Sequence, residues 1–177
     1  MRVDLTFDRL LGDQDRRLIS ALSDAVYPSN GAHGLSTLPI QWAPQTIRAL
    51  VWDHSRLVCH VGALVRSAVI DSRPVPVGGI GGVVTAPGHR KHGYARAALS
   101  AMHQHLIEDQ RVSFLLLFCP AEFCGFYERL GWRVFAGTAQ VLQQDEVVSF
   151  TLNRAMVRSG TEAAPRSGTL DLRGAPW

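Results

Sequence analysis

The sequence predicts a mixed α/β (α+β) fold, in which a mostly antiparallel central sheet of about six or seven strands carries helices on both faces. Two observations predict it. Short apolar runs of strand character follow one another with brief turns between them, which is typical of antiparallel pairing. One strand, helix and strand unit between Val75 and Cys119 requires a parallel pair with a right-handed crossover. The 177 residues, 46% of them hydrophobic, suffice for one core.

The first half of the chain supplies four strands and one helix. Val3–Phe7 alternates apolar and polar residues, as a strand does. Apolar residues at helical spacing predict a helix from Asp15 to Tyr27, which Pro28 ends. The loop 28–44, rich in turn residues, has the length of a lid or an acceptor-binding loop. Short turns then join three strands of an antiparallel meander: 47–53, 57–70 and 75–85.

The second half holds the main helix and a strand buried on both faces. Apolar residues line one face of a helix from Arg90 to Ile107, and the run Ser113–Cys119 is almost continuously apolar. Pro120 opens a short helix that Gly131 closes. Two last strands are predicted at 132–135 and 147–152.

The composition excludes several classes of protein. The 18 Lys and Arg residues against 15 Asp and Glu give a charge of +3, too small an excess for nucleic-acid binding. No run approaches the roughly 18 apolar residues of a membrane span, and Asp4 and Asp8 interrupt the apolar stretch that a signal peptide needs. Cys59, Cys119 and Cys124 lack zinc-type pairing. We expect a cytoplasmic protein with reduced thiols, no metal, and no nucleic-acid or membrane partner.

A glycine-rich turn before the main helix points to an anion site, because helix N-termini bind phosphate. A Walker loop is excluded, since Tyr94 and Ala95 stand where lysine and a hydroxyl are needed. A dinucleotide fingerprint starting at Gly79 and Gly81 is excluded, since Val84 replaces the third glycine inside a strand. The remaining design is Arg/Gln-x-x-Gly-x-Gly/Ala, which fits a pyrophosphate and is written here Arg90-Lys91-His92-Gly93-Tyr94-Ala95.

The hexapeptide follows a strand, and about thirty-five residues later comes Phe126-Tyr127-Glu128-Arg129-Leu130-Gly131-Trp132. With these two motifs, the segment Val83–Trp132 resembles the GNAT (Gcn5-related) N-acyltransferases. The resemblance implies a GNAT-like sheet whose parallel fourth and fifth strands splay apart around acyl-CoA. It places the pantetheine on Val83, Val84 and Thr85 and the pyrophosphate on Arg90, Lys91, His92, Gly93, Tyr94 and Ala95. Tyr127 matches the position of the general acid that protonates the departing CoA thiolate.

The general base is left open by the sequence. The fourth strand of many relatives carries a glutamate facing the acceptor, but this chain has Gly79, Ile80, Gly81 and Gly82 there. Candidates elsewhere are His33, His60 and Glu122, and a water relay to solvent is an equal alternative. The glycines also open space for a bulky acceptor.

Two branches of the family look nearest, the aminoglycoside 2′-N-acetyltransferases and, less closely, the nodulation-type N-acyltransferases. The segments 49–54 and 60–63 resemble strands of the former, and the ending 171–177 is similar to its Trp-terminated tails, whose carboxylate helps hold the sugar. Asp171 and Trp177 are therefore expected to bind the acceptor. The same tail composition is also typical of a disordered terminus.

We expect an acyltransferase domain at 1–157 and a tail at 158–177 that covers the acceptor site. The function expected is direct acetyl transfer from acetyl-CoA to a primary amine of a small molecule. The alternative is a GNAT-shaped module that binds acyl-CoA without turnover, because the strand carboxylate is missing. The oligomeric state stays open, with a homodimer among the options.

Overall fold

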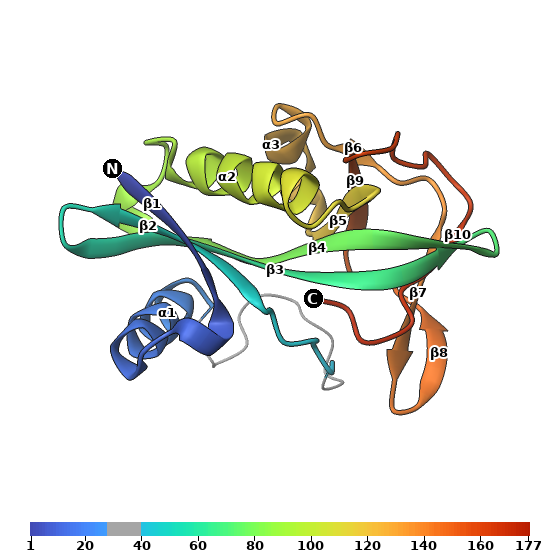
Figure 1. Ribbon diagram of the computed structural model, residues 1–177, viewed down its shortest axis with the longest axis horizontal. Coiled ribbons are helices and arrows are strands. Elements are labelled where there is room, and N and C mark those ends of the chain that lie inside the picture. Colours follow the sequence, from blue (N-terminus) through green and yellow to red (C-terminus); the bar gives the residue numbers. More distant parts are fainter. Residues whose placement is uncertain (28–39) are drawn as a thin grey trace.

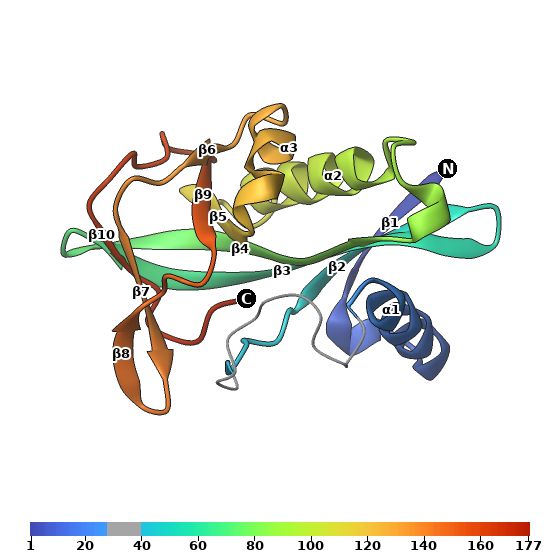
Figure 2. The ribbon, with the colours of Figure 1, turned by 180° about the vertical axis from the view of Figure 1, so that it is seen from behind.

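A computed structural model describes residues 1–27 and 40–177 of the chain. The described strands form one sheet, with α1 on one face and α2 and α3 on the other (Figure 1). The view from behind shows the same two layers of helix around the sheet (Figure 2). Most of the loop expected to act as a lid, including the candidate base His33, lies outside the described residues. The mixed fold predicted from the sequence is confirmed.

The helices are α1 (Asp13–Val26), α2 (Tyr94–Glu108) and α3 (Cys124–Glu128), with the single-turn helices η1 (Asp8–Leu10), η2 (Pro87–His89) and η3 (Ala121–Phe123). The strands are β1 (Arg2–Phe7), β2 (Ile47–Asp53), β3 (Arg56–Ile70), β4 (Arg73–Thr85), β5 (Phe114–Cys119), β6 (Arg133–Val134), β7 (Thr138–Gln143), β8 (Glu146–Ser149), β9 (Arg154–Ser159) and β10 (Thr169–Asp171). Their order is β6-β9-β5-β4-β3-β10-β7-β8. On the edge of β3 that β10 occupies in part, β2 pairs with the remaining part, and β1 pairs with β2.

The centre of the sheet follows the sequence-based prediction. β2, β3 and β4 form the expected antiparallel meander, and β4 and β5 form the expected parallel pair with α2 as the crossover. β5 is buried along both faces because α2 covers one face and the C-terminal segment covers the other. The parallel pair therefore lies in the middle of the molecule.

The end of the chain differs from the prediction. The last strands predicted were 132–135 and 147–152, but Arg154–Ser159 also forms β9 along β5, and within the predicted tail β10 pairs with both β3 and β7. The strand predicted at 147–152 is wrong in its bounds: β8 starts at Glu146, directly after the turn at Gln144 and Asp145, and its pairing with β7 ends at Ser149. Burial of Met156, Val157 and Leu170 stabilises these short strands. The small and turn residues around them leave no clear strand pattern in the sequence.

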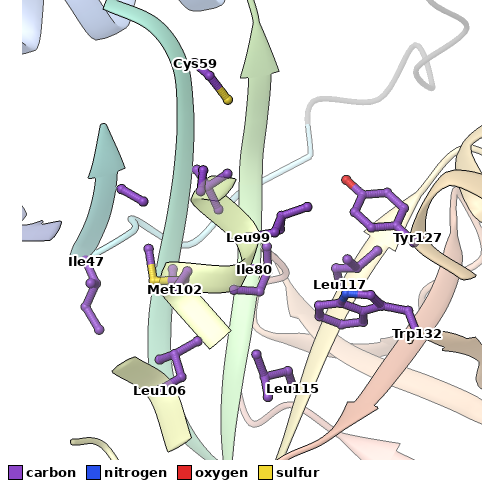
Figure 3. Close-up of a cluster of buried hydrophobic side chains, with 14 of the residues drawn as sticks. Ile47, Cys59, Ile80, Leu99, Met102, Leu106, Leu115, Leu117, Tyr127 and Trp132 are labelled. Atoms are coloured by element: carbon purple, nitrogen blue, oxygen red, sulfur yellow. The ribbon is translucent and has the colours of Figure 1, made fainter. Parts of the chain in front are cut away.

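The core is divided by the sheet. On the α2 face, Leu99, Met102 and Leu106 of α2 pack against the sheet as one cluster (Figure 3). The α1 face carries two clusters, one beneath α1 and one beneath the C-terminal segment that ends in Trp177. The stretch between these two clusters holds glycine and polar side chains, and it lies beneath the point where β4 and β5 separate. Within the described residues no helix is long and apolar enough to cross a membrane.

Candidate active site

The parallel pair opens at one end. β4 and β5 are paired from Val77 to Ile80 and from Phe114 to Leu117, and β4 then runs on to Thr85. Among residues 1–27 and 40–177, no strand pairs with the β5-facing edge of that extension. Backbone N–H and C=O groups at such an edge can pair with an extended ligand. The splay that the resemblance implied is therefore present.

A β-bulge in β4 turns the strand at this point. Gly62 pairs with Gly81 and His60 pairs with Val84, so Gly82 and Val83 together face one residue of β3. Gly82 adopts a left-handed φ of 56°, which glycine tolerates without strain. The glycine run that the sequence showed therefore includes the residue that permits the bulge.

His60 of β3 holds the bulge in place. Its Nδ1 donates to the carbonyl of Gly82 at 2.8 Å, which leaves Nε2 to accept from Nη1 of Arg48 at 3.2 Å. Burial, together with the nearby charge of Arg48, lowers the pKa of His60 to about 4. Because both ring nitrogens are engaged and the ring is a weak base, the geometry favours a positioning role for His60 over the role of general base.

Polar side chains from two further elements complete this network. Arg48 binds the carboxylate of Asp8, with Nη2 2.8 Å from Oδ1, and its Nη1 donates to Oε1 of Gln45 at 2.9 Å. Burial raises the pKa of Asp8, but hydrogen bonds and charges from Arg16 and Arg48 more than offset this, so the pKa lies below its usual range. The Gln45 side chain lies against Gly82. Asp8 and Gln45 also border a cavity of about 410 Å³.

The predicted pyrophosphate residues form an open turn at the start of α2. Gly93 caps the helix with a left-handed φ of 84°, and a Cβ there would meet no atom within 4 Å. Arg90, Lys91 and His92 are exposed, so two cations and the imidazole lie beside the free N–H groups of the first helical turn. Tyr94 and Ala95 are half-buried as that turn begins. The arrangement suits a phosphorylated ligand.

The three predicted pantetheine residues contribute their backbone. Val83 packs toward the α2 face, Val84 is buried in the cluster beneath α1, and the Thr85 hydroxyl donates to Sγ of Cys59 at 3.3 Å. Their side chains are used for packing within the sheet. What they can offer a ligand is the unpaired edge of β4.

Tyr127 points from α3 toward the splay. It is 7% exposed, and its hydroxyl points toward the Cys59 end of the cluster in Figure 3. Burial, and then the neighbouring Cys119, Tyr27 and Cys59, raise the pKa of the Tyr127 phenol above its ordinary value. The phenol therefore stays protonated at neutral pH and can donate a proton or a hydrogen bond.

Trp177 lies on the opposite face of the splay. Its indole Nε1 donates to the carbonyl of Leu116 at 3.2 Å, and its ring fills the space in which a side chain at Gly79 would stand. Its main-chain carbonyl carbon would lie 2.9 Å from a Cβ at Gly81. The guanidinium of Arg66 lies 5.4 Å above the indole and donates to the carbonyl of Ala175 at 2.8 Å. The glycines therefore make room for the C-terminal segment.

Other candidates from the sequence lie elsewhere. Asp171 pairs with Val69 near the far end of β3, and its carboxylate binds Arg173 at 2.9 Å. Residue 69 stands five positions along β3 from Leu64, which pairs with the Gly79 that Trp177 covers, a separation of roughly 17 Å in an extended strand. Glu122 is exposed on η3.

Sequence reasoning missed Gln45, Arg48 and Asp8, and no motif could have revealed them. They come together because β2 pairs beside β3, and β1, which leads into η1, pairs beside β2. In the described part of the chain, no group of three or more His, Cys, Asp or Glu side chains is placed to hold a metal ion.

Comparison with known proteins gives one matching family model and several solved structures of similar fold. The family model of the acetyltransferase (GNAT) domain matches residues 9–135. The fold is similar to Escherichia coli ElaA, with a TM-score of 0.63 and 15% identity over 89% of this chain and 99% of that chain. An acyl-CoA N-acyltransferase from Pseudomonas aeruginosa gives 0.57 and 18% identity over 90% and 100%. The ribosomal-protein-S18-alanine N-acetyltransferase of E. coli gives 0.57 and 15% over 92% and 97%. No curated protein matches significantly.

Proposed function

The chain belongs to the GNAT family of acetyltransferases, and from this premise we propose that it moves an acetyl group from acetyl-CoA directly to a primary amine of a small molecule. The amine we propose is that of an amino sugar or an aminoglycoside. The observation that carries the proposal is the splay of β4 and β5 with an open helix N-terminus on one side and a protonated phenol beside it.

The described residues fit an acyl-CoA donor. The unpaired edge of Gly82–Thr85 accommodates an extended pantetheine, and the turn from Arg90 to Ala95 has room and positive charge for a pyrophosphate. Bound acyl-CoA supplies the acyl group as an activated thioester. The chain contributes the binding edge, the orientation and the proton donor.

In the proposed mechanism Tyr127 is the general acid. Its phenol donates to the sulfur of the departing thiolate and so stabilises the negative charge that develops there. His60 keeps the Gly82 carbonyl and the bulge in one position, and the acceptor ammonium loses its proton through water to solvent. No described side-chain carboxylate is assigned as the base.

The acceptor binds on the α1 face in this proposal. The indole of Trp177 covers Gly79, and its main-chain carbonyl group beside Gly81 accepts a hydrogen bond from the acceptor ammonium. We further propose that residues 1–157 form the acyltransferase domain and that residues 158–177 cover the acceptor site. The aminoglycoside 2′-N-acetyltransferase branch remains our proposal for the nearest relatives.

The proposal is tested by thiol release from acetyl-CoA with a panel of aminoglycosides, amino acids and polyamines. We expect turnover with amino sugars, and we expect Tyr127→Phe to lower kcat about a hundredfold while the Kd for CoA stays unchanged. Ser20→Ala, which removes an exposed side-chain hydroxyl on α1, is the control and should keep its turnover. Unchanged kcat in Tyr127→Phe would remove the acid assignment. Tight CoA binding without turnover on any amine would instead favour the acyl-CoA-binding module.

A further inference from the structure

Four aromatic side chains lie in a continuous row on the α1 face. The ring of Trp177 lies 6.3 Å from that of Phe118, Phe118 lies 4.6 Å from Phe150, and Phe150 lies 6.0 Å from Trp42. These residues come from four separate segments of the chain. We call this set, Trp42, Phe118, Phe150 and Trp177, the aromatic row.

The aromatic row starts at the splay. Leu117 is the last residue of β5 that pairs with β4, and Phe118 follows it directly. Because side chains alternate along a strand, Phe118 shares its face with Leu116, whose carbonyl binds the Trp177 indole. The inner end of the row therefore lies beneath the place where the proposed acyl group is transferred.

The other end of the aromatic row is open to solvent. Trp177 is only 5% exposed, Phe118 and Phe150 are half-buried, and Trp42 is 43% exposed. Single exposed aromatic residues are ordinary, whereas a connected apolar surface that leads to a candidate site is typical of a ligand-binding surface. Phe150 also borders a cavity of about 440 Å³, which it lines together with residues of β7 and β9.

Hydrogen bonds fix the outer end of the aromatic row in place. The backbone N–H and carbonyl of Gln41 bind the side chain of Gln143 on β7, each at 2.9 Å. The N–H of Ala43 binds the carbonyl of Pro176 at 2.6 Å. Trp42 is thus held between the β7–β8 hairpin and the C-terminal segment, so its ring belongs to a preorganised surface.

We propose that the outer part of the aromatic row, the exposed Trp42 with the half-buried Phe150 beside it, is an acceptor subsite that stacks on a ring of an amino sugar while one of its amines reaches the splay; the buried Trp177 supports the row from the inner end. Aromatic faces attract ammonium groups and pack on apolar ring faces, and an amino sugar presents both. The length of the row favours an acceptor of more than one ring. This inference rests on the proposed function and specifies the acceptor class.

Steady-state kinetics with kanamycin, a multi-ring amino sugar, and putrescine, a ring-free diamine, test the subsite at saturating acetyl-CoA. Trp42→Ala should raise the KM for kanamycin about tenfold with kcat unchanged, and the KM for putrescine should not change. Trp42→Phe keeps a ring and should restore most of the affinity. Leu5→Ala removes another exposed apolar side chain, on β1, and should have no effect.

Calorimetric binding of kanamycin to the CoA complex separates the two proposals. Binding that weakens in Trp42→Ala without any acetylation would keep the subsite and contradict the proposed transfer. Acetylation of both amines with a KM ratio that Trp42→Ala leaves unchanged would keep the transfer and overturn the subsite. Absence of both binding and acetylation of kanamycin would overturn the subsite. Phenethylamine, an apolar arylalkyl amine, serves as a further probe. If Trp42→Ala weakens the binding of phenethylamine only, the amino-sugar subsite is likewise overturned.

Discussion

The two sides of the splay are built in different ways. The proposed donor side, from the β4 edge through the turn at Arg90–Ala95 into α2, is one continuous segment of chain. The proposed acceptor side is assembled from η1, β2, β3, the linker before β2 and the C-terminal segment. The donor side is formed by local backbone conformation, and the acceptor side by contacts between residues distant in sequence.

This difference determines how each side responds to an amino-acid substitution. A local turn depends on the φ angles of a few residues, so a substitution there acts on one binding step. An assembled surface depends on each packed or charged partner, so a single change displaces several groups at once. The following predictions measure that contrast, beginning with the largest change in free energy.

The first prediction concerns the buried imidazole of the acceptor side. The pKa of His60 is about 4 in the folded protein against 6.5 in the unfolded chain. The unfolded state therefore binds the extra proton between these pH values, and stability falls as the pH drops from 6.5 to 4. The contribution is about 3 kcal/mol. Between pH 6.5 and 4, the free energy of unfolding of His60→Gln, which can keep both hydrogen bonds, should fall by about 3 kcal/mol less than that of the unmodified protein. Urea unfolding at several pH values measures this difference.

Other groups titrate in the same range, so the comparison needs a control. Asp8 has a lowered pKa and its stabilising effect on the fold is lost at still lower pH, in both proteins alike. His54→Gln changes a side chain that is 97% exposed and should follow the unmodified protein. Parallel stability curves for the unmodified protein and His60→Gln would show that the imidazole is not buried as described.

The contrast also explains what the sequence could predict. The strand, the turn with Gly93 and the helix follow one another along the chain, so the contiguous motif sufficed to predict this segment and to propose it as the donor side. Tyr127 could be proposed from the sequence because it belongs to a contiguous motif. In contrast, Gln45 and Arg48 carry no local signal, and β9 and β10 are short segments stabilised by burial. The glycines were noticed, but their partner Trp177 is known only from the fold.

The second prediction displaces Trp177 without changing it. A Cβ at Gly79 would overlap the indole ring, so Gly79→Ala should push Trp177 out of its place on the α1 face. We expect kcat/KM for the amine to fall about a hundredfold, or roughly 2.7 kcal/mol, while the Kd for CoA stays unchanged. Stopped assays at varied amine and saturating acetyl-CoA give kcat/KM for the amine, and a separate calorimetric titration with CoA gives its Kd.

The neighbouring glycine provides the matched control for this change. Gly78 points to the α2 face, where a Cβ would lie 3.1 Å from Cδ1 of Leu106. Gly78→Ala should therefore cost some stability while leaving the acceptor constants as they are. Equal losses of amine kcat/KM in the two variants would mean that the effect comes from the sheet and not from Trp177.

The last and smallest change tests the donor side alone. Gly93 has a φ of 84°, so Gly93→Ala forces alanine into a left-handed conformation or shifts the start of α2. We expect the Kd for CoA to rise about tenfold, or roughly 1.4 kcal/mol, with little change in the KM for the amine. Gly88→Ala also adds a methyl group to open space, but at ordinary φ, and should bind CoA normally. Equal CoA affinity in the two variants would contradict a backbone-made phosphate site, because only the conformation at Gly93 separates them.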